Sequence, residues 1–433
     1  MIKKIALVLL IFSVSFGSII AQELDARERY EGLNALVGPN TFFDNHPTGF
    51  MLYELDSGWV HFEKNSHMNF IPASTTKLFT FYASLMVLRD RTNTFRYVEN
   101  GEEITIWGSG DPSWKYNILP QPKIEDFLSK YKKVNFSASN WKDESFGYGW
   151  QWDDYYYSYS AERSPLPIYG NIVIFKNVNR TPQSTIPAFA NSVKTFDKVS
   201  PTVRRDFHSN FFYYNPKTYT NPGPMLPYVT SPELTVQLLR DVLKKPVELV
   251  NTELPASARV FNGGSMNPLW KEMLQESDNF IAEQILLMVS DQLFGELNSD
   301  RAIDYIKKTY LKDLPDSPKW VDGSGLSRHN LVTPRSMITL MEKIDRAIPR
   351  DQLMQLLPQG GINGTLKNNY KAPRPYIFAK TGTISNNHAL VGIIRTDSGR
   401  HHAFAFINNN YMNKASEIRR EMEKVLLYIK ENY

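Results

Sequence analysis

The sequence of 433 residues contains no cysteine. This absence excludes a disulfide framework and the N-terminal cysteine of a lipoprotein attachment site. A large excess of charge is also absent, because 49 Lys and Arg residues stand against 45 Asp and Glu residues. The resulting net charge of +4 is too small to indicate a nucleic-acid partner. No His, Asp and Glu cluster at metal-ligand spacing is evident, so we expect neither a metal nor another cofactor.

Long hydrophobic runs are missing apart from one near the N-terminus, at residues 5–20. The run follows Lys3 and Lys4 and precedes the small residue Ala21, which is the pattern of a secretory signal peptide. It is shorter than the roughly 20 apolar residues of a comfortable membrane-spanning helix, and an uncleaved anchor is the alternative. We therefore predict a signal peptide at 1–21 and an exported protein, with no transmembrane segment and a net charge of +2 after processing.

Three short motifs follow one another along the chain: Ser74-Thr75-Thr76-Lys77, Ser277-Asp278-Asn279 and Lys380-Thr381-Gly382. Each is weak evidence alone, because Ser and Lys are common and the segments 129–132 and 139–142 also fit the first pattern, S-x-x-K. Only one choice of segments gives all three motifs in this order with a suitable local context. Together they indicate a serine acyl-transfer site in which lysines replace histidine.

The residues around Ser74 favour this interpretation. Residues 48–55 and 59–63 have the pattern of two strands joined by a turn, and a largely apolar helix is predicted after Ser74. A serine at a helix start is most often a simple N-cap, which is the alternative here. Lys77 lies one turn later on the same helix face, and the helix N-terminus would stabilise an alkoxide and an oxyanion.

The chemistry explains why these residue types are needed together. A serine hydroxyl becomes a nucleophile when a neighbouring base takes its proton, and a lysine serves as that base only if burial and a second cation lower its pKa. We therefore predict Lys77 as the base and Lys380 as the second cation. Ser277 would pass the proton to the leaving amine, and Asn279 would hold a substrate amide and help to orient Lys77.

The third motif extends to Lys380-Thr381-Gly382-Thr383 and lies between apolar segments at 376–379 and 389–394. This arrangement predicts a β-hairpin beside the cleft, and the alternative is the start of an ordinary edge strand. The backbone N–H groups of Ser74 and Thr383 would form an oxyanion hole. Lys380, Thr381 and Thr383 would bind a terminal carboxylate of the substrate.

Five segments carry a resemblance to a known enzyme family: F-I-P-A-S-T-T-K at 70–77, S-D-N-F-I-A-E-Q-I-L at 277–286, D-G-S-G-L-S-R at 322–328, G-T-L-K at 364–367 and K-T-G-T at 380–383. Two further matches are G-S-G-D-P at 108–112 and G-W-Q-W-D-D at 149–154. In order and spacing, these segments are similar to D-alanyl-D-alanine carboxypeptidases/endopeptidases, the DacB-like group of low-molecular-mass penicillin-binding proteins. They extend over nearly the whole mature chain and favour this group over the simpler β-lactamases.

The resemblance implies an α/β protein of the α+β type with the transpeptidase fold of penicillin-binding proteins and β-lactamases, in which helices flank an antiparallel sheet and a large domain is inserted. It also implies a D-Ala-D-Ala carboxypeptidase of the bacterial cell envelope, periplasmic or extracellular. Its substrates would be peptidoglycan stem peptides, and β-lactam antibiotics would be covalent inhibitors that acylate Ser74. Additional endopeptidase action on cross-links is left open, as are the stem-peptide preference and the oligomeric state.

Ser74 and Ser277 are 203 positions apart, which is more than one helix and its connections require. Neither an internal repeat nor a low-complexity linker is evident. We therefore predict an inserted domain at 94–231, ending where Ser231 and Pro232 begin a helix. Residues 22–93 and 232–433 would form the catalytic domain, with an amphipathic C-terminal helix packed on its sheet.

The inserted region contains an aromatic segment at 146–157, in which Trp150, Asp153 and Asp154 stand close together. Such a density of aromatic side chains usually means a core or a buried interface between domains, which is one interpretation. The resemblance supports another, in which these three residues border the cleft and a carboxylate recognises the free amine of a stem peptide.

Two other functions compete with the carboxypeptidase. A serine β-lactamase would need a base to hydrolyse the acyl-enzyme, and Glu233 superficially resembles such a glutamate but precedes Ser277 instead of following it. A non-catalytic peptidoglycan-binding module is disfavoured, because every chemically required residue is present.

Overall fold

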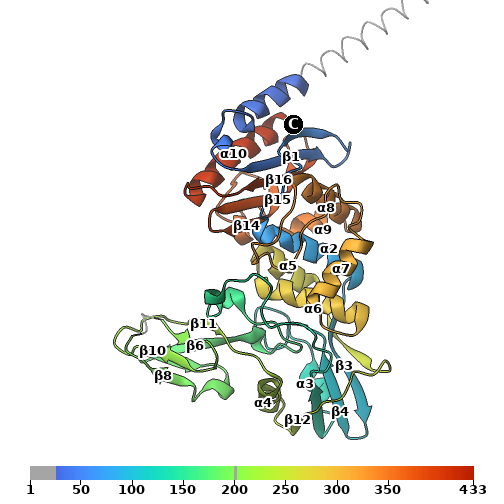
Figure 1. The fold of residues 1–433 in the computed structure, drawn as a ribbon, viewed down its shortest axis with the longest axis vertical. Helices are drawn as coiled ribbons and strands as arrows, with labels where there is room; N and C mark the ends of the chain where they lie inside the picture. The colour runs from blue at the N-terminus through green and yellow to red at the C-terminus, as the bar shows by residue number, and fades with distance from the viewer. Residues whose placement is uncertain (1–25, 199–201) are drawn as a thin grey trace, which may run out of the picture.

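The computed structural model describes residues 26–198 and 202–433, so the predicted signal peptide at 1–21 lies outside the described residues. Figure 1 shows an elongated molecule, with a large sheet and its helices at one end and smaller β-rich lobes at the other. In the described part of the chain, no helix is long and apolar enough to cross a membrane.

A five-stranded antiparallel sheet has the strand order β14-β15-β16-β1-β2. Its strands are β14 (Ile377–Ile384), β15 (Asn387–Arg395), β16 (His401–Asn408), β1 (Thr48–Glu54) and β2 (Val60–Lys64). β15 is buried along almost its whole length, as expected for an apolar strand covered on both faces. β1 and β2 form one predicted hairpin, and β14 and β15 form the other, with Lys380 opposite Val391. β1 also pairs with β16, so that segments from both ends of the chain complete one sheet.

Helices cover both faces of this sheet, which confirms the predicted α+β class. On one face, α10 (Ala415–Asn432) and a helix at 26–37 share a hydrophobic core with the sheet residues Phe50 and Phe406. The packing predicted for the C-terminal helix is therefore confirmed. The other face is covered by α2 (Lys77–Val87), α5 (Asn267–Gln275), α6 (Asn279–Phe294), α7 (Ser299–Thr309), α8 (Pro334–Ala347) and α9 (Arg350–Leu356).

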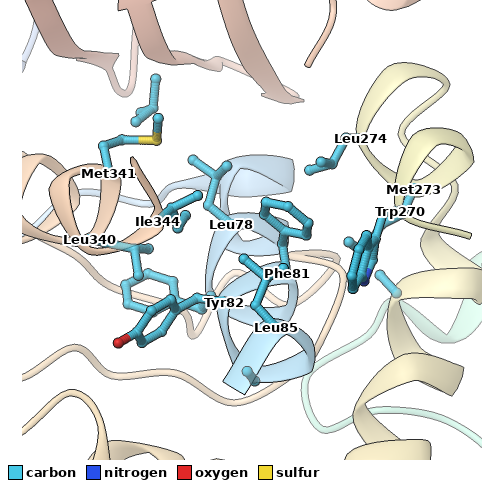
Figure 2. Close-up of a cluster of buried hydrophobic side chains, with 14 of the residues drawn as sticks. Leu78, Phe81, Tyr82, Leu85, Trp270, Met273, Leu274, Leu340, Met341 and Ile344 are labelled. Atoms are coloured by element: carbon cyan, nitrogen blue, oxygen red, sulfur yellow. The ribbon is translucent and has the colours of Figure 1, made fainter. Parts of the chain in front are cut away.

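α2 is the central helix of the second layer. Figure 2 shows Leu78, Phe81 and Leu85 of α2 between side chains of α5 and side chains of α8. Because α2 is apolar on nearly every side, it is buried along most of its length. Its first residue, Lys77, is therefore carried into the interior of the protein.

A second hydrophobic core lies at the other end of the molecule (Figure 1). It is built on a sheet of order β12-β5-β4-β3-β13 and two three-stranded sheets, β11-β6-β7 and β8-β10-β9. The strands are β3 (Thr92–Asn100), β4 (Glu103–Gly108), β5 (Lys133–Ser137), β6 (Ile172–Val178), β7 (Thr181–Ser184), β8 (Val193–Thr195), β9 (Arg204–Arg205), β10 (Phe212–Tyr214), β11 (Met225–Pro227), β12 (Val247–Leu249) and β13 (Arg259–Gly264). The helices are α3 (Ile124–Leu128) and α4 (Pro232–Leu243).

The predicted end of the inserted domain at 231 is wrong. Ser231 does cap a helix, because its side chain accepts a hydrogen bond from the Leu234 N–H, but this helix, α4, packs on the second core through Leu238 and Leu239. β12 then pairs with β5, and β13 pairs with β3. The strands β12 and β13 therefore belong to the second body, the part of the molecule built around the second hydrophobic core. A helix-start pattern indicates where a helix begins, but it does not indicate the body on which the helix packs. We propose that the inserted unit extends from 92 to about 264, the bounds set by β3 and β13.

Candidate active site

Ser74 lies in a short 3-10 helix, η2 (Ala73–Thr76), which continues directly into α2. Its hydroxyl accepts a hydrogen bond from Lys77 Nζ at 3.0 Å, whereas the N-cap position of α2 is Thr76. The simple N-cap interpretation of Ser74 is therefore wrong. Ala73 has a φ of 48°, a left-handed conformation that is uncommon outside glycine and costs conformational energy. This turn presents Ser74 to the solvent side while Lys77 remains buried.

Two glycines allow neighbouring segments to enclose this turn. A Cβ on Gly325 would lie 2.0 Å from the carbonyl oxygen of Ala73, and a Cβ on Gly382 would lie 2.4 Å from the carbonyl oxygen of Pro72. No side chain fits at either distance, because backbone atoms cannot move aside as a flexible side chain can. The loop around Gly325 and strand β14 therefore hold the Ser74 turn from two sides.

The ammonium group of Lys77 is fully enclosed and makes three hydrogen bonds. Its Nζ lies 3.0 Å from Ser74 Oγ, 2.6 Å from Asn279 Oδ1 and 2.7 Å from the carbonyl oxygen of Ser324. Burial lowers the pKa of Lys77 to about 8, although the negative charges of Asp322 and other carboxylates oppose this. The structure thus brings Asn279 and Lys77 together as predicted, and it places a lysine that can lose its proton beside the serine.

Lys380 projects from β14 into the same site. Its Nζ donates to Ser277 Oγ at 2.9 Å and to the carbonyl oxygen of Thr381 at 2.9 Å. Burial, followed by the charge of Lys77, holds the pKa of Lys380 well below its usual range. Two buried ammonium groups repel each other, so the charge of Lys77 makes it easier for Lys380 to lose its proton. Ser277 itself has a φ of 64°, a second strained position in the site.

Asp278, the aspartate of the second motif, has a structural role. Asp278 caps α6, because its carboxylate accepts a hydrogen bond from the Ile281 N–H at 2.8 Å. It also accepts one from the hydroxyl of Tyr116 at 2.9 Å. The aspartate therefore fixes the point where α6 begins, between Ser277 before it and Asn279 after it.

A loop at 322–327 supplies the carbonyl of Ser324 that accepts from Lys77. Asp322 organises this loop by accepting from the backbone N–H groups of Gly325 at 2.8 Å and Ser327 at 2.7 Å. Glu283 of α6 accepts from the Ser324 N–H at 2.7 Å, and burial raises the pKa of Glu283 to about 7. These two carboxylates hold the loop against α2 and α6.

A cleft of about 240 Å³ opens beside Ser74 and Ser277. Its other polar lining residues are Thr365, Asn369, Tyr370, Thr381, Thr383, His388 and Arg419. Thr381 donates to the hydroxyl of Thr365 at 2.8 Å, and Thr383 Oγ1 lies 2.8 Å from His388 Nδ1. The guanidinium of Arg419 has no hydrogen-bond or ion-pair partner within residues 26–198 and 202–433, although it lines the cleft. The cleft therefore combines the hydroxyl of Ser74 with further hydroxyl groups and a guanidinium.

A larger cavity of about 430 Å³ meets the cleft at Ser277. Its lining includes Tyr116, Asn279, Glu272 and Met225, and the last of these comes from β11 of the second body. Burial raises the pKa of Glu272 to about 7. The site is therefore bordered on one side by the inserted unit.

The chain matches a known enzyme family over most of its length. The model of the D-Ala-D-Ala carboxypeptidase 3 (S13) family matches residues 42–200 and 234–428, which is well over half of the chain. The protein belongs to the S13 family. The match includes all three motifs and most of the inserted unit.

Relatives of this S13 protein match over most of its length. D-alanyl-D-alanine carboxypeptidase DacB of Haemophilus influenzae is 22% identical over 415 residues, covering 84% of this chain and 85% of the relative. Penicillin-sensitive carboxypeptidase A of Dictyostelium discoideum is 25% identical over 450 residues, covering 85% and 83%. The crystal structure of penicillin binding protein 4 from Haemophilus influenzae aligns with a TM-score of 0.69 at 20% identity and covers 92% of this chain and 97% of that chain. This structural alignment shows that the two proteins share the same fold.

The structure separates the aromatic segment from the two cavities of the S13 site. Trp150 donates to Asp322 Oδ2 at 3.0 Å and so supports the loop behind Lys77. Asp153 is exposed, and Asp154 accepts from the hydroxyl of Tyr159 at 2.7 Å. The Tyr159 carbonyl in turn accepts from Asn279 Nδ2 at 3.0 Å. Asp154 thus reaches the site only through Tyr159, and the proposed role of the two aspartates in substrate selection stays a prediction.

Sequence reasoning missed several residues that border or support the site. Glu283 carried a usable signal, because it is the one acidic residue in the apolar stretch 280–290 of α6, and lone charges in such stretches are rarely buried without a reason. Thr365 lies within the G-T-L-K segment at 364–367, but a threonine at this position did not by itself indicate a role in the site. Arg419 and Tyr116 carried no signal, because each reaches the site from an element far from the three motifs.

Proposed function

We propose that this protein is a serine-type D-Ala-D-Ala carboxypeptidase that acts on peptidoglycan stem peptides through an acyl-enzyme on Ser74. The observation that carries the proposal is the 3.0 Å hydrogen bond between Lys77 and Ser74 in an S13 chain, made by a lysine whose pKa burial lowers to about 8. β-Lactam antibiotics would acylate the same serine, as supported by the solved β-lactam complex of the similarly folded Haemophilus influenzae protein.

In the acylation step, neutral Lys77 takes the proton of Ser74 as the hydroxyl oxygen attacks the carbonyl carbon between the two D-Ala residues. The backbone N–H groups of Ser74 and Thr383 stabilise the oxyanion. The proton then passes by way of Ser277 to the nitrogen of the leaving D-Ala, and the C–N bond breaks. Water then attacks the carbonyl carbon of the Ser74 ester, the shortened stem peptide leaves as a carboxylic acid, and Ser74 regains its hydroxyl. Cleavage of a cross-link at the same bond would use the same steps.

Substrate binding decides which lysine is neutral. The carboxylate of the terminal D-Ala, placed by Thr381 and Thr383, would lie close to Lys380. A nearby negative charge favours a protonated lysine. Lys380 therefore holds its proton when the substrate is bound, and its charge favours the neutral form of Lys77. The enzyme thus forms its base as the carboxylate arrives.

We assign Arg419 to the same carboxylate, because it lines the cleft with Thr381 and Thr383 and has no partner within the described ranges. Replacing the substrate carboxylate by an amide is expected to lower kcat/KM by about 10- to 100-fold, since a hydrogen bond to a charged group contributes about 1.5–3 kcal/mol. Arg419→Gln is expected to lower kcat/KM for the substrate with the free carboxylate. The kcat/KM for the amide substrate should stay almost unchanged. Steady-state D-Ala release from both peptides measures the two effects.

The matched control is Arg420→Gln, since Arg420 is the next residue of α10 and is exposed. The Arg420→Gln variant should have the same kcat/KM as the unchanged protein for both substrates. An Arg419→Gln protein that loses the same factor on acid and amide would remove Arg419 from carboxylate binding.

Asp153 and Asp154 are expected to favour stem peptides with a free side-chain amine. Changing both to Asn should reduce turnover of such a peptide while leaving the rate of penicillin labelling unchanged, and acetylating the amine should have the same effect as the mutation. Asp126→Asn on the exposed side of α3 is the control. Equal effects on peptide and penicillin, or none on either, would make these carboxylates structural.

Two assays separate this function from its competitors. D-Ala release from a model stem peptide with slow nitrocefin turnover supports the carboxypeptidase, and the reverse supports a β-lactamase. Glu233, the residue that resembled a deacylation base, is exposed at the start of α4 on the second core and lines neither cavity, which disfavours the β-lactamase. Absence of both activities would support the non-catalytic module. A cross-linked dimer of stem peptides in the same assay measures the endopeptidase component.

We further propose that the protein is exported and acts in the cell envelope. The support is the signal-peptide pattern at 1–21 and the location of the proposed substrate outside the cytoplasm.

A further inference from the structure

A cluster of two histidines and a glutamate lies at the end of the large sheet that is remote from Ser74. Glu54 ends β1, His61 lies in β2, and His402 lies in β16. One possible ligand atom from each side chain can be chosen so that all three lie within 4.8 Å of one another. β2 and β14, which carries Lys380, are the two edge strands of the sheet, and β15 separates β14 from β16, which carries His402.

The sheet geometry brings the three side chains together on one face. Glu54 and His402 are directly paired residues of β1 and β16. Paired residues project from the same face of a sheet, and Leu52 and Phe404, two positions away, show that this is the face covered by α10. The cluster therefore lies in the layer between the sheet and the C-terminal helix.

His61 reaches this face because of a β-bulge. Leu52 pairs with Phe62 and Tyr53 pairs with Val60, so His61 is an extra residue in β2. Bulges re-aim a side chain out of the strict alternation of a strand. The Nε2 atom of His61 thereby comes within 3.1 Å of Glu54 Oε2.

His402 is the unusual member of the cluster. Its exposed fraction is 0%, and neither ring nitrogen has a hydrogen-bond partner within the described residues. A buried polar atom without a partner costs free energy, and such atoms are rare in folded proteins.

The surroundings of Glu54 complete the site. Its carboxylate also accepts from Ser57 Oγ at 2.8 Å and lies 3.6 Å from Arg400 Nη1. The ring of Tyr433 packs edge-on against His61, with 5.2 Å between ring centroids, and against His402 at 6.0 Å. Tyr433 is the last residue of the chain, whose C-terminal end is marked near β1 in Figure 1. Tyr433 thus shields the cluster from bulk water, while His61 keeps partial access with a side-chain exposed fraction of 14%.

We propose that Glu54, His61 and His402 form a zinc site that fastens the edge strand β2 to β1 and β16. Two imidazole nitrogens and one carboxylate oxygen are ligands that Zn²⁺ accepts, and a water molecule would complete four-coordination. Atoms within 4.8 Å need only small side-chain adjustments to reach Zn–N and Zn–O distances of about 2.0–2.2 Å. The ion would give His402 its missing partner and would take the Glu54 carboxylate as a ligand.

The test uses the full-length protein, stripped with EDTA and then titrated with ZnCl₂. We expect one zinc per chain by calorimetry and by elemental analysis after gel filtration, together with a rise in Tm that increases with zinc concentration. His61→Gln and His402→Gln should weaken zinc binding by more than about 100-fold, since loss of even an outer-shell partner of a metal site costs 10- to 100-fold. In ¹⁵N-labelled protein, zinc should shift the ring-nitrogen resonances of both histidines.

The matched control is His401→Gln, because His401 neighbours His402 on β16 but projects from the opposite face. It should bind zinc as the unchanged protein does. Penicillin labelling of Ser74 should be the same with and without zinc, which keeps this test independent of the proposed peptidase. If His402→Gln fails to fold, the partly exposed His61 still provides the decisive variant. Absence of stoichiometric zinc binding, or a His61→Gln protein that binds zinc with unchanged affinity, would overturn the site.

Discussion

The Ser74→Ala protein is expected to form no covalent adduct with benzylpenicillin, whereas the unchanged protein gains the mass of one penicillin per chain. The reason is that Ser74 Oγ is the hydroxyl oxygen that accepts a hydrogen bond from Lys77 Nζ, at 3.0 Å. Release of D-Ala from a stem peptide should fall on the order of 10³-fold or more, because removing the nucleophile removes the covalent route entirely. Mass spectrometry of the intact protein and a coupled D-Ala assay measure the two effects.

The decoy motif provides a control for this first prediction. Ser129→Ala alters another S-x-x-K segment at an exposed serine and should change neither labelling nor turnover. Ser74 and Ala differ by one oxygen at a half-buried position, so the variant is expected to keep the Tm of the parent. Continued labelling of Ser74→Ala protein would show that the nucleophile is a different residue.

The second large effect is expected for Lys77→Arg, which keeps the positive charge but prevents its loss. A guanidinium has a pKa above about 12 and does not release its proton near neutral pH, so it cannot accept one from Ser74. General-base assistance of this kind contributes about 10²- to 10⁴-fold, and the acylation rate should fall by a factor in this range. Stopped-flow labelling with a fluorescent penicillin measures the rate constant.

The pH dependence of the parent enzyme supplies an independent check of the same assignment. The base must be neutral, and the pKa of Lys77 is lowered to about 8 by burial. Acylation should therefore be slow at pH 6, rise by about tenfold per pH unit, and level off above about pH 8. A rate that falls as the pH rises through this range would assign the base elsewhere.

Lys245→Arg is the matched control for the size change in the lysine variant. Lys245 is a partly buried lysine whose Nζ donates to the carbonyl oxygens of Leu128 and Tyr131 in the second body. A guanidinium can make the same hydrogen bonds, so acylation should be unchanged. Near-normal acylation by Lys77→Arg would remove Lys77 from the role of the base.

Much of the site could be predicted because its chemistry is local in sequence. Ser74 and Lys77 are three positions apart, and a helical turn brings such residues together in any fold that makes the segment helical. Lys380 and Thr383 are likewise fixed relative to each other by one strand. These short-range relations do not depend on how the rest of the chain packs.

The inserted unit shows where prediction from pattern failed. The start of α4 was located correctly by Ser231 and Pro232, but the helix belongs to the second body. Its membership depends on the pairing of β12 with β5 and of β13 with β3, between segments about 110 to 170 residues apart. Periodicity reports which residues of a strand are buried, and it does not report the partner against which they are buried.

The sequence by itself determined Ser74 as the candidate nucleophile, the two lysines and the order of the three motifs along the chain, because each motif carries its own backbone geometry and side-chain chemistry. Only the tertiary structure decided the lowered pKa values of these lysines, because burial lowers the pKa of Lys77 to about 8, and burial followed by the charge of Lys77 lowers the pKa of Lys380. The same holds for Glu54, His61 and His402, which meet only because β1 pairs with β16 across almost 350 residues and β2 carries a bulge. Contacts of this kind come from long-range strand pairing, which local sequence patterns do not encode.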